Sequence, residues 1–320
     1  MIITEENLKY FASPISDSED EMCKHAISMV RDALKNIGYS DNGNIIGKLE
    51  SESSAYQIRM GFPGTSRDIN IFVQGSYANG TNVRRESDVD IAIVQEDIFQ
   101  PRYREGVTGA NYGFTPAVKQ AKKLKDEVEE ALKDKFGPNE VQRHNKSVHV
   151  SGNSYRKESD SVPCLRFRDY SNDYDCNPNN YVKGIYIHSD DGKVIINYPE
   201  QHIRNGVVKN QKTSYRFKKI VRIFKHLKIQ MSNLHYLSAQ KMSSFLIESI
   251  LWNVRVENYL RYQNISSQVR EVIEYLSSHL DNIYTWNEIN NVKLIRQDGI
   301  NRVSICQDFI NDLNKAFTFR

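Results

Sequence analysis

Residues 75–90 place a Gly-Ser pair and an Asp-x-Asp pair between two strand-like stretches, and this arrangement constrains the fold more than any other part of the chain. Asp68–Gln74 has apolar Ile69, Ile71 and Val73 at every second position, which is a strand pattern. Val89–Val94 is a short apolar run, which is typical of a buried strand. The chain is therefore expected to leave one strand at Gly75 and to enter the next beside Asp88 and Asp90.

The two aspartates are expected to act together. Asp88 and Asp90 lie two positions apart, and side chains at i and i+2 of a strand point the same way. Like charges this close repel unless a cation lies between them, and carboxylates suit Mg²⁺, which proteins hold together with substrate phosphates. Gly75 and Ser76 offer backbone N–H groups, a hydroxyl and a position without Cβ to a phosphate. Each pair alone is common in turns and strand ends, so the prediction rests on their combination.

In this order, the motifs resemble the signature of the nucleotidyltransferase superfamily that shares the DNA polymerase β fold. That resemblance implies a third carboxylate on a later strand, and Asp160 fits. Asp160–Cys164, with the sequence Asp-Ser-Val-Pro-Cys, is similar to the Asp-Val-Val-Pro segment of the bacterial cyclic-oligonucleotide synthases, the CD-NTases. These are relatives of cyclic GMP-AMP synthase and oligoadenylate synthase. Ser161 departs from the usual Val but removes no charged group.

Three further stretches resemble clade E of the CD-NTases, namely Ile195–Pro199 with His202, Thr213–Lys225 and Ser243–Asn253. Met242 and Ser243 stand where the family pattern leads us to expect a proline-containing segment. This departure again removes no charged or nucleophilic group. The similarity covers about residues 70–255, with the motifs in the family's order.

The resemblance implies an α+β fold. It predicts a DNA polymerase β-like nucleotidyltransferase core with a mixed sheet, then a C-terminal helical lobe like that of oligoadenylate synthase, with the active site in the cleft between them. We place the catalytic lobe at 1–205, including an N-terminal brace helix over Asp20–Ile37, and the helical lobe at 206–320. Apolar residues at helical spacing support that helix, and a second, highly charged helix is expected over Pro116–Phe136.

Composition indicates a folded protein without a membrane span. Hydrophobic residues make up 39% and charged residues 26% of the 320 residues, and Glu248 interrupts the longest apolar stretch. The N-terminus lacks the pattern of a signal peptide, and the four cysteines are scattered, so we expect a reducing, cytoplasmic location. Between Glu200 and Glu248 ten Lys or Arg occur and no acidic residue, which favours an anionic ligand.

Three residues of the helical lobe are candidate nucleotide ligands. The resemblance implies that Lys225 and Ser244 hold the triphosphate and that Phe245 stacks on a base. A surface lysine, a helix cap and a core aromatic are the structural alternatives for these three. Four histidines show no spacing typical of metal ligands: His188, His202, His226 and His235.

The chemistry that the resemblance implies is nucleotidyl transfer. Two Mg²⁺ ions, for which Mn²⁺ can substitute, would be held by Asp88, Asp90 and Asp160 and would clamp the phosphates of an NTP. ATP, together with a second NTP that could be a pyrimidine such as UTP, would be joined into a cyclic dinucleotide, for example cyclic UMP-AMP. The product would serve antiphage (CBASS) defence through a downstream effector, with no obligatory nucleic acid. The alternatives are a nucleotidyltransferase that makes linear products or modifies RNA, a small molecule or a protein, and a non-catalytic nucleic-acid sensor.

Overall fold

The computed structural model describes residues 1–43, 47–83, 88–117, 123–299 and 301–320. It divides into two compact units. One contains Ser16–Ala78 and Asp88–Glu200, and the other contains Met1–Ile15, Asn79–Ser87 and Gln201–Arg320. The first is called the sheet unit below and the second the helical unit.

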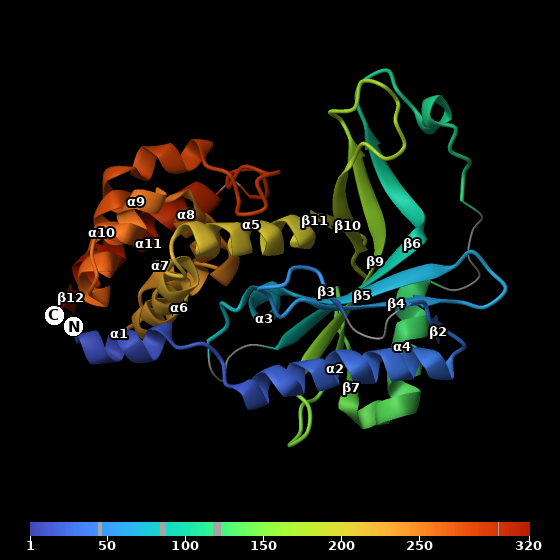
Figure 1. Cartoon of the computed structure of the whole chain (residues 1–320), viewed down its shortest axis with the longest axis horizontal. Helices are drawn as coiled ribbons and strands as arrows, with labels where there is room; N and C mark the ends of the chain where they lie inside the picture. The colour runs from blue at the N-terminus through green and yellow to red at the C-terminus, as the bar shows by residue number, and fades with distance from the viewer. Residues whose placement is uncertain (44–46, 84–87, 118–122, 300) are drawn as a thin grey trace. The chain divides into compact units, whose positions relative to one another are not determined.

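A mixed sheet forms the frame of the sheet unit (Figure 1). Its strands lie in the order β11-β10-β9-β6-β5-β4-β2, with β3 paired to β4 and the β7–β8 hairpin paired to β9. β6 and β9 are parallel, and the other pairs of this sheet are antiparallel. The strands are β2 Ser40–Asp41, β3 Gly47–Lys48, β4 Tyr56–Gly61, β5 Asp68–Gln74, β6 Val89–Tyr103, β7 Val141–Arg143, β8 Val148–Val150, β9 Ser159–Tyr170, β10 Val182–His188 and β11 Val194–Asn197.

The two strands that flank the Gly-Ser and Asp-x-Asp motifs lie next to each other in the sheet. β5 spans the residues predicted from their alternation, and its apolar side chains Ile69, Ile71 and Val73 are fully buried. β6 begins at Val89 as predicted but continues to Tyr103, past a register shift between Gln95 and Phe99. The apolar run therefore marks only the buried first half of a long strand.

Helices α2 (Asp17–Asn36) and α4 (Leu124–Phe136) pack against each other and against strands of this sheet. In α2, Ser16 caps the first turn through Glu19, and the apolar stripe from Cys23 to Leu34 is buried. The predicted brace helix is thus present. The predicted charged helix over Pro116–Phe136 is present from Leu124, whereas residues 118–122 lie outside the described residues. Two short 3₁₀ helices, η1 Gly109–Tyr112 and η2 Pro138–Glu140, and helix α3 Gly75–Asn79 complete the elements up to Glu200.

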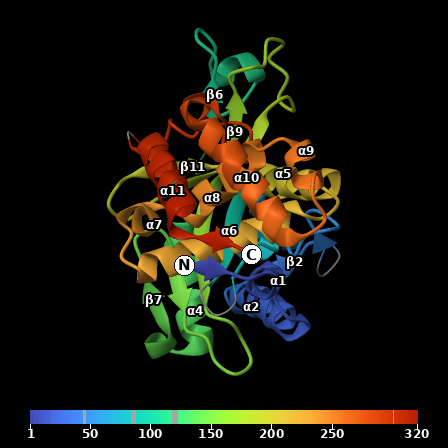
Figure 2. The ribbon, with the colours of Figure 1, turned by 90° about the vertical axis from the view of Figure 1, so that its left-hand side faces the viewer.

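Helices α6, α8, α10 and α11 of the helical unit, which Figure 2 labels, contribute to one large apolar cluster of buried residues. In α6, the buried stripe contains Phe217, Ile220, Val221, Phe224 and Leu227, at the spacing that predicted a helix. The elements are β1 Ile2–Ile3, α1 Glu5–Ala12, α5 Pro199–Lys212, α6 Phe217–Asn233, α7 Leu237–Lys241, α8 Ser244–Asn253, α9 Val256–Leu260, α10 Ile265–Ser278, η3 Leu280–Thr285, α11 Arg302–Ala316 and β12 Thr318–Phe319.

The two ends of the chain belong to this same unit. β1 pairs with β12 in parallel, with Ile2 opposite Thr318, and the N and C labels lie close together in Figure 2. The first fifteen residues therefore group with the helices, although the sequence placed them in the catalytic lobe at 1–205. The predicted boundary at residue 205 falls inside α5.

The expected α+β fold, with a mixed sheet followed by a helical lobe, is confirmed. Within the part of the chain that the structure describes, no helix has both the length and the apolar character needed to cross a bilayer.

Candidate active site

Gly75 and Asp90 meet where β5 passes into α3. In the antiparallel β5–β6 pair, Gln74 lies opposite Asp90, so the residue after Gln74 begins α3 directly beside the Asp90 carboxylate. Gly75 has φ +69°, and a Cβ built there would overlap Asp90 Oδ2 and lie 3.3 Å from Asp90 Cγ. Glycine is therefore required at position 75 by both its backbone conformation and the nearby carboxylate. Ser76 follows it, half-buried, in the first turn of α3.

This close approach gives a first testable expectation. Gly75→Ala must move the Asp90 side chain or the start of α3, and either change displaces a proposed metal ligand. We expect product formation to fall by roughly 100-fold, as misplacing catalytic groups by about 1 Å can do. Gly64→Ala controls for backbone strain, because Gly64 is an exposed turn glycine with φ +76° and a Cβ added there would meet no described atom within 4 Å. Equal initial rates in the two variants would contradict a role for the Gly75 contact.

Three carboxylates gather at the first residues of β6 and β9. Asp90 and Asp160 are register partners in the parallel β6–β9 pair, and Asp88 lies immediately before β6. Burial, together with the nearby charges of Asp160 and Asp88, raises the pKa of the Asp90 carboxyl to about 7. Burial and the carboxylates of Glu158 and Asp160 raise the pKa of Asp88 in the same way. Carboxylates that hinder one another's ionisation form a site that a divalent cation would stabilise.

The residues present fit a hard divalent cation. Carboxylate oxygens are the ligands that Mg²⁺ and Mn²⁺ prefer, and Asp88, Asp90 and Asp160 supply them at the starts of two adjacent strands of one sheet. Nucleotidyltransferases of this fold use a divalent metal. A bound cation would offset the mutual repulsion of these carboxylates and favour their ionised forms.

Two histidines contact the third carboxylate, and the sequence had not singled them out. His149 on β8 is the register partner of Asp160, and its Nδ1 lies 3.2 Å from Asp160 Oδ1. His149 Nε2 lies 3.2 Å from Glu158 Oε1. His144, in the turn between β7 and β8, places Nδ1 3.9 Å from the same oxygen of Asp160. No short-range sequence motif predicts these contacts, because they depend on how β8 pairs with β9.

In the helical unit, Lys225 belongs to a buried polar cluster. Its Nζ lies 2.5 Å from Glu248 Oε1 and 3.2 Å from Thr81 Oγ1, and the Lys225 and Glu248 side chains are each only 4% exposed. His202 Nε2 lies 2.7 Å from Glu248 Oε2 and 3.2 Å from Asn79 Nδ2. Although burial alone would raise the pKa of Glu248, Lys225 and His202 hold it well below its usual range.

The other two candidate ligands of the helical lobe lie at the start of α8. Ser244 is exposed, and the helix cap is its neighbour Ser243, whose Oγ accepts the Leu246 N–H at 3.1 Å. Phe245 is half-buried against the apolar cluster of this unit, with its ring edge-on to His202 at 5.4 Å. Ser244 is therefore not the helix cap, which was the structural alternative for this residue.

Several cations of the acid-free stretch are structural. Arg222 is buried and donates to the carbonyl oxygens of Ala12 and Gly80, and burial lowers its pKa to about 10. Arg216 donates to the carbonyls of Tyr259 and Tyr262. These arginines are therefore partnered by backbone carbonyl oxygens and not by acidic side chains.

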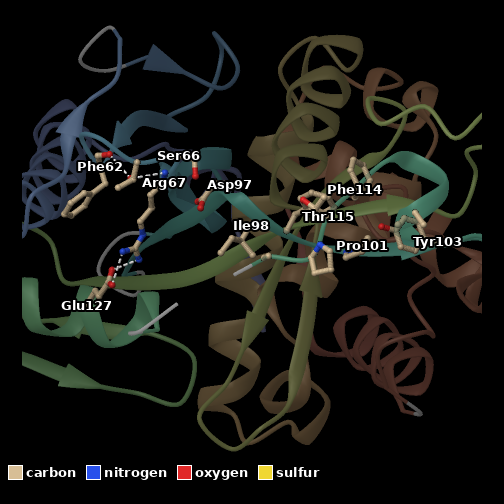
Figure 3. Close-up of a pocket in the computed structure, with 16 residues that line it drawn as sticks. Phe62, Ser66, Arg67, Asp97, Ile98, Pro101, Tyr103, Phe114, Thr115 and Glu127 are labelled. Carbon is tan, nitrogen blue, oxygen red and sulfur yellow. Dashed lines mark hydrogen bonds and ion pairs between the residues drawn. The ribbon is translucent and has the colours of Figure 1, made fainter. Parts of the chain in front are cut away.

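A hollow of about 960 Å³ lies elsewhere in the sheet unit, along the second half of β6 (Figure 3). An ion pair between Arg67 and Glu127 forms one wall, and Pro101, Tyr103 and Phe114 contribute to the other (Figure 3). None of the predicted site residues lines it. The carboxylate cluster at the start of β6 is a separate feature.

Comparison with known proteins agrees with the fold. The nucleotidyltransferase domain model matches residues 59–141, and the model for the cGAS/DncV-like nucleotidyltransferase C-terminal helical domain matches residues 204–318. The first match contains Gly75, Ser76, Asp88 and Asp90. The fold and these matches define a nucleotidyltransferase with a helical C-terminal domain.

Full-length relatives narrow the family. The cyclic GMP-AMP synthase CdnE03 of Staphylococcus schleiferi is 43% identical over 319 residues, covering 100% of this chain and 98% of that protein. The cyclic dipyrimidine nucleotide synthase CdnE of Cecembia lonarensis is 33% identical and covers 92% of each. The structure of Elizabethkingia meningoseptica CdnE with GTP and Apcpp matches with TM-score 0.73 and 28% identity, over 98% of both chains. The chain therefore belongs to the CD-NTase family of cyclic nucleotide synthases, as its motifs indicated.

Proposed function

We propose that this nucleotidyltransferase condenses two NTPs into a cyclic dinucleotide, with Asp88, Asp90 and Asp160 as the residues that hold Mg²⁺. The observation that carries the proposal is the register that sets Asp90 beside Asp160 on parallel strands, with Gly75 against the Asp90 carboxylate. A binding module that only senses nucleic acid has no use for such a cluster. The names of the full-length relatives, all cyclic nucleotide synthases, support the same class of product.

Each residue has a defined part in this proposal. Bound Mg²⁺, or Mn²⁺ in its place, supplies positive charge to the phosphates and lowers the pKa of the attacking ribose hydroxyl. Asp160 accepts the hydroxyl proton, and Gly75 and Ser76 leave room for the triphosphate and donate to it. Lys225 and Ser244 bind the triphosphate, and Phe245 stacks on a base, as the family resemblance implies. The second bond forms by the same chemistry with the roles of the two nucleotides exchanged.

For the bases, we propose ATP and GTP as the main substrates. The relative named for GMP and AMP shares 43% identity across the whole chain, whereas the one named for two pyrimidines shares 33%. A product that contains a pyrimidine, from UTP, is the alternative that the clade E motifs allow. An assay that supplies all four NTPs distinguishes the two.

The biological setting is proposed from the family resemblance. The cyclic dinucleotide acts as a second messenger in antiphage (CBASS) defence in the cytoplasm, where a downstream effector binds it. A binding assay between the purified product and a candidate effector tests this part without any assumption about the active site.

A two-nucleotide pocket predicts a characteristic response to salt. A polymerase that tracks along RNA contacts many phosphates, and its binding weakens steeply as salt rises, whereas a pocket for two nucleotides depends on salt only mildly. We expect product formation without added RNA or DNA, and a rate that falls less than about tenfold between 50 and 200 mM salt. Rates measured across that range, with and without an RNA primer, provide the check. Strict primer dependence or a ladder of linear products would favour the RNA-extending alternative.

A further inference from the structure

Asp160 faces two different sets of groups. Its charge acts on Asp88 and Asp90, whose pKa values it helps to raise. Its Oδ1 also lies 3.2 Å from His149 Nδ1 and 3.9 Å from His144 Nδ1. One ligand atom from each of His144, His149 and Asp160 lies within 4.8 Å of the other two. This His-His-Asp group shares Asp160 with the proposed Mg²⁺ site but adds two nitrogen ligands.

The surroundings of His149 orient it as a metal ligand. Its Nε2 lies 3.2 Å from Glu158 Oε1 and its Nδ1 lies 3.2 Å from Asp160 Oδ1, so each ring nitrogen faces a carboxylate oxygen. Without a metal, Nδ1 donates a hydrogen bond to Asp160, and a metal ion bound at Nδ1 would take the place of that proton. The N–H would then be on Nε2 beside Glu158, and histidine ligands of metals are commonly oriented by a carboxylate beside the other ring nitrogen.

The distances suit a small tetrahedral ion after one modest movement. Bonds of about 2.0–2.1 Å from Zn²⁺ to nitrogen or oxygen place neighbouring ligand atoms about 3.4 Å apart. The His149–Asp160 separation of 3.2 Å meets this directly, and the His144–Asp160 separation of 3.9 Å requires a shift of His144. The His144 side chain is 43% exposed, so rotation is open to it, while Lys125 Nζ anchors its backbone by donating to the carbonyl at 2.8 Å.

We propose that His144, His149 and Asp160 form a distinct site for Zn²⁺, and that Zn²⁺ bound there inhibits the enzyme by engaging Asp160. Imidazole nitrogen favours Zn²⁺ strongly over Mg²⁺, which prefers oxygen, so the two ions would compete for the Asp160 carboxylate. The negative charges of Asp88 and Glu158 nearby favour a cation at this position. The inhibitory consequence rests on the proposed function of Asp160, whereas the binding site does not.

The binding half is tested on the full chain without nucleotide. Isothermal titration of Zn²⁺ should show one tight site in the wild type, and His144→Ala and His149→Ala should each weaken it at least about 100-fold. His188→Ala, which removes an exposed histidine of β10 in the same unit, should leave it unchanged. Because His144 is exposed, its substitution should not compromise folding, which a melting curve verifies. No Zn²⁺ binding by the wild type, or equal binding by all four proteins, would overturn the site.

The inhibitory half is tested by adding Zn²⁺ at a fixed, saturating Mg²⁺ concentration and expressing each rate relative to the same variant without Zn²⁺. Wild type should lose activity over the concentrations at which calorimetry shows binding, and His144→Ala should need at least about 100-fold more Zn²⁺. Binding at this site with undiminished activity would overturn the inhibition. Absence of any cyclic product in Mg²⁺ alone would instead refute the proposed function and leave the calorimetric result to decide the site.

Discussion

The double substitution Asp88→Asn and Asp90→Asn should abolish product formation while the protein stays folded. Asn keeps the shape of each side chain but loses the negative charge that holds a divalent ion. Metal stabilisation of phosphoryl transfer amounts to several kcal/mol, and each 1.4 kcal/mol is tenfold in rate, so we expect a loss of at least about 1,000-fold. Initial rates with labelled NTPs measure it, and Asp134→Asn, on the exposed face of α4, serves as the matched control.

The same double variant should be at least as stable as the wild type when no metal is bound. The pKa of Asp90 is raised to about 7, so in the absence of metal its ionisation above the unfolded value of about 3.9 disfavours the folded state. Replacing it with Asn removes that penalty. The melting temperature of the metal-free double variant at pH 7.5 should therefore equal or exceed that of the wild type. Wild-type turnover by the double variant would rule out this metal site, and a collapsed melting temperature would contradict the account of its electrostatics.

Lys225→Met should strongly destabilise the helical unit. Its ammonium lies 2.5 Å from Glu248 Oε1 in a position where both side chains are almost completely buried. Loss of one partner from a buried ion pair costs roughly 3–5 kcal/mol, because the other charge remains buried. Denaturant unfolding monitored by circular dichroism measures the change. Lys219→Met, on the exposed side of the same helix, is the control and should change stability by less than about 0.5 kcal/mol.

Two further measurements separate the parts that Lys225 plays. Adding Glu248→Gln should restore more than half of the lost stability, because the amide still bonds to His202 and Thr81 but carries no charge. Since the pKa of Glu248 is lowered in the folded state, its contribution is present above the unfolded pKa of about 4.3 and is lost as pH falls, so the wild-type advantage should shrink in acid. If Lys225 also binds the triphosphate, KM for NTP rises in the folded single and double variants. An unchanged KM would restrict Lys225 to a structural role.

The sequence predicts those parts of the fold that are encoded locally. β5 and the start of β6 are visible because apolar residues at every second position and a short apolar run are typical of buried strands, and α2 is visible from its apolar stripe. The placement of Asp160 beside Asp90 required the family resemblance. These two residues are 70 positions apart, and the parallel register that joins them follows from sheet assembly and not from local pattern.

The polar partners of the site were harder to predict for the same reason. In the sequence, Glu248 stands out as the end of an acid-free stretch and as a break in an apolar stretch, and neither feature predicts that it binds Lys225 from helix α8. His149 reaches Asp160 through the β8–β9 register, which no spacing of histidines reveals. In each case an ionisable side chain is paired across elements, whereas a sequence pattern describes one element at a time.

The central claim is that this carboxylate cluster makes a cyclic dinucleotide, and mass spectrometry of the product tests it most directly. Wild-type protein is incubated with four labelled NTPs and Mg²⁺, without nucleic acid, and the mixture is treated with phosphatase before analysis. We predict a phosphatase-resistant species with the mass of two joined nucleoside monophosphates less two waters, which is absent from the Asp88→Asn, Asp90→Asn variant. Linear products that lose their terminal phosphates, or the same species from the double variant, would contradict the account.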